Sequence, residues 1–180
     1  MSGRHCIAGA MMFAFASTGT ASGNMLLNGD FETGQLTPWF ASDGTPWITS
    51  DESHSGTYSA AAYAGDAIRQ DFAAVSTDDI QEVSIWVMRE GGAFNQYSFY
   101  YADGTTGTHL IDDIGGGDNW TYFELTQNLV VGKFLVGFQI YGTTEGPSYM
   151  DDVRIDAVPA PAALALLGIA GMAGRRRRRF

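Results

Sequence analysis

The chain has 180 residues, 45% of them hydrophobic, with 20 acidic and 10 basic residues and a formal net charge of −10. All the acidic residues lie between Asp30 and Asp156, where only four basic residues accompany them, so this region alone carries a net charge of about −16. Such a surface repels nucleic-acid phosphates, which excludes nucleic-acid binding, and it favours divalent cations. The length fits one domain between two short terminal segments.

Residues 1–23 have the three parts of a secretory signal peptide. A short basic start is followed by the apolar core Cys6–Phe15 and by the small residues Ser17–Ser22 as a cleavage region. We expect cleavage between Ala21 and Asn24; the alternative is a disordered N-terminus. Because Cys6 is the only cysteine, the mature protein would have no disulfide and no thiol chemistry.

Residues 24–157 form the predicted domain, and their pattern is almost wholly that of strands. Short β-branched and aromatic runs alternate with turn sequences such as Asp103-Gly104 and Glu145-Gly146-Pro147, and no stretch shows helical periodicity. This pattern predicts an all-β fold, an antiparallel β-sandwich. The expected strands are Leu26–Glu32, Trp47–Ser50, Tyr58–Ala64, Ile68–Ala73, Glu82–Arg89, Gln96–Ala102, Thr108–Asp112, Trp120–Thr126, Lys133–Tyr141 and Tyr149–Asp156.

Three short segments bracket this domain: the opening run Leu26–Gly34 with Pro38-Trp39 after it, the turn Ser55–Ser59, and the closing strand Tyr149–Ile155. In this order they resemble carbohydrate-binding modules with the galactose-binding-like jelly roll. The middle of the domain follows only the general strand pattern. The resemblance implies a jelly-roll sandwich that binds carbohydrate.

Aromatic side chains are the candidate sugar-binding groups, because the resembled modules hold pyranose rings against flat aromatic rings. In one predicted strand, alternation puts Trp86 on the face opposite the aliphatic side chains, and in the next it separates Tyr100 from the other aromatic rings. We predict Trp86 and Tyr100 as platforms on a concave face, with Trp47 and Trp39 as alternatives in loops. Asn95, Gln96, Arg89 and Gln139 could hold the hydroxyl groups, and nothing in their spacing singles out one of them. The other possibility for each ring is a place in the core.

The closing strand carries a second candidate site. Alternation puts Asp151 on the same face as Val153 and Ile155, which should face the core, and a buried carboxylate needs a partner. In the resembled modules such an aspartate often joins an early glutamate in a structural calcium site. The resemblance implies Glu32 and Asp151 as Ca²⁺ ligands, with carbonyl oxygens from the turn Ser53–Gly56. The alternative is that Asp151 accepts backbone amide bonds with no ion.

Residues 158–180 combine an extended Pro/Ala motif, an apolar stretch and a basic end. Proline lacks an amide donor and holds the motif extended, and the arginines prefer the cytoplasmic side of a membrane. The motif is Val158, Pro159, Ala160 and Pro161, the stretch is Ala162–Ala173, and the basic end is Arg175, Arg176, Arg177, Arg178 and Arg179.

This arrangement resembles the PEP-CTERM sorting signal, with Ala160 in place of the usual glutamate. The resemblance implies insertion into the inner membrane, followed by cleavage near the Pro motif by an exosortase. The alternative is a permanent single-pass anchor, for which about 27 Å of helix is barely long enough.

Catalysis has little support in the sequence, and we expect no enzyme. His54 and His109 lie far apart in the chain, and adjacent carboxylates on a strand point to opposite faces. The expected function is that of an exported cell-surface or extracellular protein that binds carbohydrate, in particular exopolysaccharide. One alternative is a structural surface protein without a sugar site, and another is a β-sandwich polysaccharide hydrolase.

Overall fold

The computed structural model describes residues 23–89, 95–111, 117–142 and 146–158. Nearly all of the predicted signal peptide lies outside the described residues, as does the predicted sorting signal after Val158. The predicted 24–157 domain is therefore the part whose fold is seen.

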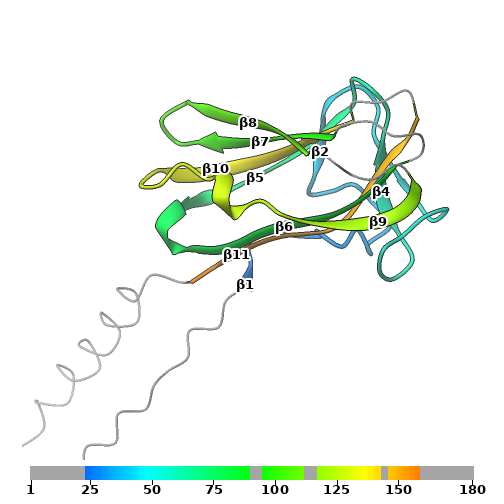
Figure 1. The fold of residues 1–180 in the computed structure, drawn as a ribbon, viewed down its shortest axis with the longest axis horizontal. Coiled ribbons are helices and arrows are strands. Elements are labelled where there is room, and N and C mark those ends of the chain that lie inside the picture. Colours follow the sequence, from blue (N-terminus) through cyan, green and yellow to red (C-terminus); the bar gives the residue numbers. More distant parts are fainter. Residues whose placement is uncertain (1–22, 90–94, 112–116, 143–145, 159–180) are drawn as a thin grey trace, which may run out of the picture.

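The fold is a sandwich of two antiparallel β-sheets, which form the upper and lower layers in Figure 1. This confirms the predicted all-β antiparallel sandwich. The six-stranded sheet has the order β3–β4–β11–β6–β9, with β1 beside β11, and the five-stranded sheet has the order β2–β5–β10–β7–β8. The strands are β1 (Gly23–Asn24), β2 (Phe40–Asp43), β3 (Trp47–Thr49), β4 (Ser59–Ala62), β5 (Ala67–Ser76), β6 (Ile80–Arg89), β7 (Asn95–Tyr101), β8 (Thr106–Ile111), β9 (Gly117–Glu124), β10 (Phe134–Tyr141) and β11 (Ser148–Ala157).

The core lies between the two sheets and follows the alternation of the strands. In β6, Val83, Ile85 and Val87 are fully buried in it, as the sequence predicts. The opposite sheet contributes Phe99 and Phe138, whose rings lie 5.5 Å apart. Each such side chain stabilises the fold by roughly 1.5–3 kcal/mol relative to an exposed one, so the core holds the sheets together without a disulfide.

The opening run is not a strand, contrary to the prediction for Leu26–Glu32. It forms turns, because Asn28 and Phe31 adopt positive φ angles of 52° and 53°, which a strand does not allow. Phe31 is nevertheless fully buried against Trp39. The run therefore supplies core side chains from a loop, whereas the short strand β2 after it has no clear strand pattern in the sequence.

Strand β11 contains an irregularity that changes which side chains face the core. The register with β6 shifts between Asp151 and Arg154, and Asp152 has a φ of 46°. Met150 and Val153 both lie in the core, so the alternation is broken between them. Asp151 is fully buried, but it pairs in register with Trp86 and shares its outward face. The prediction that Asp151 points into the core is therefore wrong.

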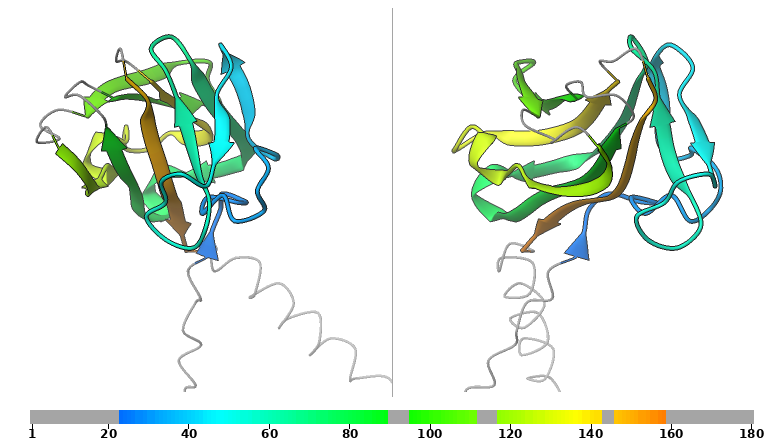
Figure 2. Two further views of the ribbon diagram at one scale, coloured as in Figure 1. Left: turned by 90° about the vertical axis from the view of Figure 1, so that its right-hand side faces the viewer. Right: turned by 45° about the vertical axis from the view of Figure 1, so that its right-hand side comes forward.

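The beginning and the end of the domain lie side by side. Gly23 pairs with Ala157 and Asn24 with Asp156, so β1 and the end of β11 leave the sandwich together (Figure 2). Within the described residues, no helix is long and apolar enough to cross a membrane. The two flanking segments thus attach at the same end of the sandwich.

Candidate functional site

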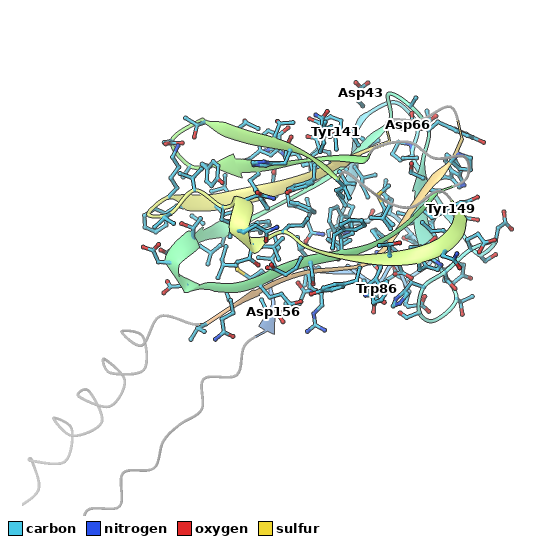
Figure 3. The ribbon with its side chains drawn as sticks, in the orientation of Figure 1. Asp43, Asp66, Trp86, Tyr141, Tyr149 and Asp156 are labelled. Carbon is cyan, nitrogen blue, oxygen red and sulfur yellow. The ribbon has the colours of Figure 1, made fainter. Side chains whose placement is uncertain are left out.

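The two predicted aromatic platforms lie on opposite outer faces of the sandwich. Trp86 projects from β6 on the outside of the six-stranded sheet, in register with Tyr122. Tyr100 projects from β7 on the outside of the five-stranded sheet, the side on which Tyr141 lies in Figure 3. One binding surface therefore cannot hold both rings, which corrects the expectation of a shared concave face.

Tyr100 belongs to a network of polar side chains on the five-stranded sheet. Its hydroxyl donates a hydrogen bond to Gln139 Oε1 at 2.6 Å and lies 3.5 Å from the hydroxyl of Tyr141. Gln139 comes from the neighbouring strand β10 and is only 5% exposed. Burial, and then the hydrogen bond with Tyr141, raise the pKa of Tyr100 above its usual value, so the phenol is neutral and keeps its proton.

Arg69 on β5 covers the ring of Tyr100. Its guanidinium carbon lies 3.6 Å from the ring centroid, and its Nε donates to Asp71 Oδ1 at 2.6 Å. The strand between them presents Gly137, which pairs in register with Asp71 on one side and Tyr100 on the other. A Cβ at Gly137 would lie 2.5 Å from Asp71 Oδ1, so the glycine leaves the gap in which the ion pair lies.

Around this centre the outer face of the five-stranded sheet is polar in the middle and apolar at its edges. Ser98 and Thr108 share a hydrogen bond of 2.8 Å in the same row of the sheet. Phe40 at one edge is 43% exposed, and Leu110 at the other is 55% exposed. We call this surface the Arg69–Tyr100 face, and it comprises Phe40, Arg69, Asp71, Ser98, Tyr100, Thr108, Leu110, Gln139 and Tyr141.

The side chains of this face are suited to bind hydroxyl groups of a ligand. The face places a guanidinium, a carboxylate, an amide and two phenols within one network, and these groups both donate and accept hydrogen bonds. The sequence predicts Tyr100 and names Gln139 only as one of four equal polar candidates, and it gives no prediction for Arg69 and Asp71. The signal for the latter two was the Arg-x-Asp spacing on one strand, which puts both side chains on the same face.

The other three predicted platforms, Trp39, Trp47 and Trp86, do not belong to the Arg69–Tyr100 face. Trp39 is 2% exposed and its Nε1 donates to the carbonyl of Asn28, so it is a core residue and not a platform. Trp47 lies in strand β3 of the six-stranded sheet and not in a loop; it is partly buried, and its ring lies 4.9 Å from that of Tyr63. Trp86 carries His54 stacked on it at 3.8 Å, which covers one face of the indole.

Glu32 and Asp151 hold the turn of residues 53–58 from two segments of the chain. Glu32 Oε1 accepts hydrogen bonds from the amides of Thr57 and Tyr58, both at 2.8 Å. Asp151 Oδ2 accepts from the amides of His54 at 2.9 Å and Ser55 at 3.1 Å. The structure thus brings both predicted residues to the predicted turn.

These contacts do not fit a calcium ion at the turn. Amide N–H groups of the turn face Glu32 and Asp151, whereas the prediction requires carbonyl oxygens there. The second oxygen of Asp151 accepts the amide of Asp152 at 2.7 Å. Within the described ranges, no three His, Cys, Asp or Glu side chains gather as metal ligands. The contacts are those of the ion-free alternative, and chelation decides between that alternative and the predicted calcium site.

The family profile described as "Carbohydrate binding domain" (CBM_4_9) matches residues 23–141, which is more than half of the chain. The chain belongs to this carbohydrate-binding domain family. No curated protein is similar to it in sequence.

Several solved members of the same fold are known as carbohydrate-binding modules. A module named TmCBM61, solved with β-1,4-galactotriose, has 19% identity and a TM-score of 0.58, and the match covers 74% of this chain and 98% of that one. A family 16 module has 16% identity and a TM-score of 0.56, covering 73% and 99%. The CBM22-1 xylan-binding domain of Paenibacillus barcinonensis Xyn10C has 18% identity and a TM-score of 0.54, covering 79% and 99%. At such identities the likeness shows the fold.

Proposed function

We propose that this domain binds carbohydrate on the Arg69–Tyr100 face. The observation that carries the proposal is the network in which Tyr100, Gln139 and Arg69 are fixed to one another on the outside of one sheet. Preorganised hydrogen-bond donors and acceptors suit the hydroxyl groups of sugars. Membership of a carbohydrate-binding family supports the proposed class of ligand.

The opposite sheet offers a poorer site, although it is rich in aromatic rings. Met88 and Tyr149 are buried there, with Trp47 and Trp120 packed against them. These rings mainly pack against one another, which is the structural alternative that the sequence left open for each of them. We therefore place the sugar on the five-stranded sheet.

A glycan array tests the proposed site. The full chain should bind one or more polysaccharides, with bacterial exopolysaccharides, xylan and β-1,4-galactan among those printed. Tyr100→Ala should weaken binding by about ten-fold or more, while Trp86→Ala, a matched aromatic loss on the other sheet, should leave the affinity unchanged. A folded chain that binds no glycan would favour the alternative of a structural surface protein.

We further propose that the protein is exported and sorted to the cell surface, where it meets exopolysaccharide. The signal-peptide and PEP-CTERM resemblances support this route, with an exosortase as the processing partner and the inner membrane as the first location. The solved structures of the same fold reported above are binding modules, which supports a non-catalytic role. Polysaccharide hydrolysis by this chain would contradict that role.

A further inference from the structure

Arg69 is a basic residue in a strongly acidic domain, and it pairs with an aspartate on its own strand. Between Asp30 and Asp156 the sequence has 20 acidic residues and only four basic ones, of which Arg69 is one. Its partner Asp71 lies two residues away on the same strand, and the two side chains are 24% and 53% exposed. The pair presents a positive and a negative group together to solvent, so its net charge is zero.

The pair is held flat on the sheet. The guanidinium lies over Tyr100 at 3.6 Å, so a ring face that would otherwise meet a ligand is occupied by Arg69. The gap at Gly137 lets both side chains of the pair lie across β10, and Gln139 fixes the phenol of Tyr100 from the same strand. A ligand on this face therefore meets the Arg69–Asp71 pair, with Tyr100 behind it.

We propose that Arg69, stacked on Tyr100 and paired with Asp71, is the residue that determines specificity here, selecting uncharged sugar units and rejecting anionic ones. This inference rests on the proposed function. Guanidinium N–H groups donate to sugar oxygens while the adjacent carboxylate accepts from hydroxyls, which suits neighbouring hydroxyl groups. The charge of Arg69 is already balanced by Asp71, so a uronate would gain little attraction from it. The net negative charge of the domain would also repel the uronate.

The test compares an uncharged polymer with a carboxylated form of the same polymer. The full chain is titrated calorimetrically with the tightest-binding uncharged glycan of the array, and with the same polymer after its primary hydroxyl groups are oxidised to carboxylates or, for xylan, after carboxymethylation. We expect the charged form to bind about ten-fold more weakly or worse, and added salt to narrow the difference. Equal or tighter binding of the charged form would overturn the inference.

Two variants test the role of Arg69 itself. Arg69→Lys keeps the charge and a partner for Asp71 but loses the planar group, so binding of the uncharged polymer should fall about ten-fold. Asp71→Asn keeps an acceptor for Nε and removes the compensating charge, so the affinity for the charged polymer should rise relative to the uncharged one. Circular dichroism and thermal unfolding report whether each variant is folded.

Asp103→Asn is the matched control for Asp71→Asn. Asp103 is 52% exposed and pairs with Lys133 at 3.0 Å, so its loss removes an equal charge from an ion pair elsewhere in the chain. It should leave the preference between the two polymers unchanged. A folded Arg69→Lys variant that binds like wild type would overturn the inference while the proposed function stands, whereas wild type that binds no glycan would refute the proposed function itself.

Discussion

At the scale of single residues, Asp151 is a buried carboxylate held by hydrogen bonds from the backbone. Its carboxylate is fully buried, yet it accepts backbone amides from His54, Ser55 and Asp152. Burial outweighs these hydrogen bonds and raises the pKa of Asp151 to about 6. The residue holds the turn of residues 53–58 to β11, and its contribution to the free energy of unfolding depends on pH.

The raised pKa predicts a pH dependence of stability. Between about pH 4 and pH 6 the folded state holds a proton on Asp151 that the unfolded state has released, so the free energy of unfolding rises as pH falls through this window. The gain from this group is at most about 3 kcal/mol and is complete below the unfolded pKa. Urea unfolding at pH 7, 6, 5 and 4.5 measures it.

Asp151→Asn is the control for this dependence. The variant does not titrate at that position, so its stability should change less than that of wild type between pH 7 and pH 4.5. Asp103, whose pKa is lowered to about 2 by hydrogen bonds from Thr105, acts only below this window. A variant with the same pH profile as wild type would show that Asp151 is not the group responsible.

Gly56 is a second residue on which the turn depends. It has a φ of 62°, and a Cβ there would lie 2.3 Å from the carboxyl carbon of Glu32. Gly56→Ala should therefore lower the free energy of unfolding by about 2 kcal/mol or more, because strain and the clash add. Gly104→Ala is the control, since its φ is 82° but no atom lies within 4 Å of the added Cβ.

Chemical denaturation compares the two variants. Gly104→Ala should cost only the strain of its backbone, about 1 kcal/mol. Equal losses for both variants would show that Glu32 does not pack against the turn as the structure has it.

At the scale of elements, the sequence predicts the strands better than their partners. Alternation within β6 separates the core residue Ile85 from the outward Trp86, because that pattern is local. Which sheet a strand joins depends on pairing between distant segments, so Trp86 and Tyr100 could not be assigned to opposite faces. The irregularity at Asp152 is likewise invisible in the pattern, and it is what turns Asp151 outward.

The resemblance of the first and last segments predicts more than their strand pattern does. It brings Glu32 and Asp151 to one turn, as the structure shows. It does not show which backbone groups of the turn face them. For Trp39 the sequence left a platform and a core position open, since an aromatic side chain next to a proline in a loop carries no signal of burial.

Chelation tests how this turn is held to β11. Because amides of the turn already donate to Glu32 Oε1 and Asp151 Oδ2, EDTA should shift the melting temperature of the full chain by less than about 1 °C. Differential scanning fluorimetry with EDTA, and then with excess calcium, measures it. A fall of several degrees that calcium reverses would support the predicted Glu32 and Asp151 calcium site.

At the scale of the whole molecule, both flanking segments join the sandwich at one end (Figure 2). The Arg69–Tyr100 face lies on the broad side of the sandwich formed by β2, β5, β10, β7 and β8. Attachment through the C-terminal segment would therefore leave the broad side of the domain accessible to a polymer.

The proposed sorting signal gives a prediction about processing of the whole chain. Deleting the five arginines Arg175–Arg179 should leave the precursor unprocessed in the inner membrane or change its processing, because the basic end fixes the orientation of the apolar stretch. Immunoblotting of cell fractions measures size and location. The same size and the same fractions for both proteins would contradict exosortase processing.

Nuclear magnetic resonance tests the proposed location of the sugar on the domain. The full chain, labelled with nitrogen-15, is titrated with the tightest-binding oligosaccharide, and changes in amide chemical shift are mapped. We predict the largest changes around Arg69, Tyr100 and Gln139 on β5, β7 and β10. Changes concentrated instead around His54, Trp86 and Trp120 would place the ligand on the six-stranded sheet and contradict the proposed site.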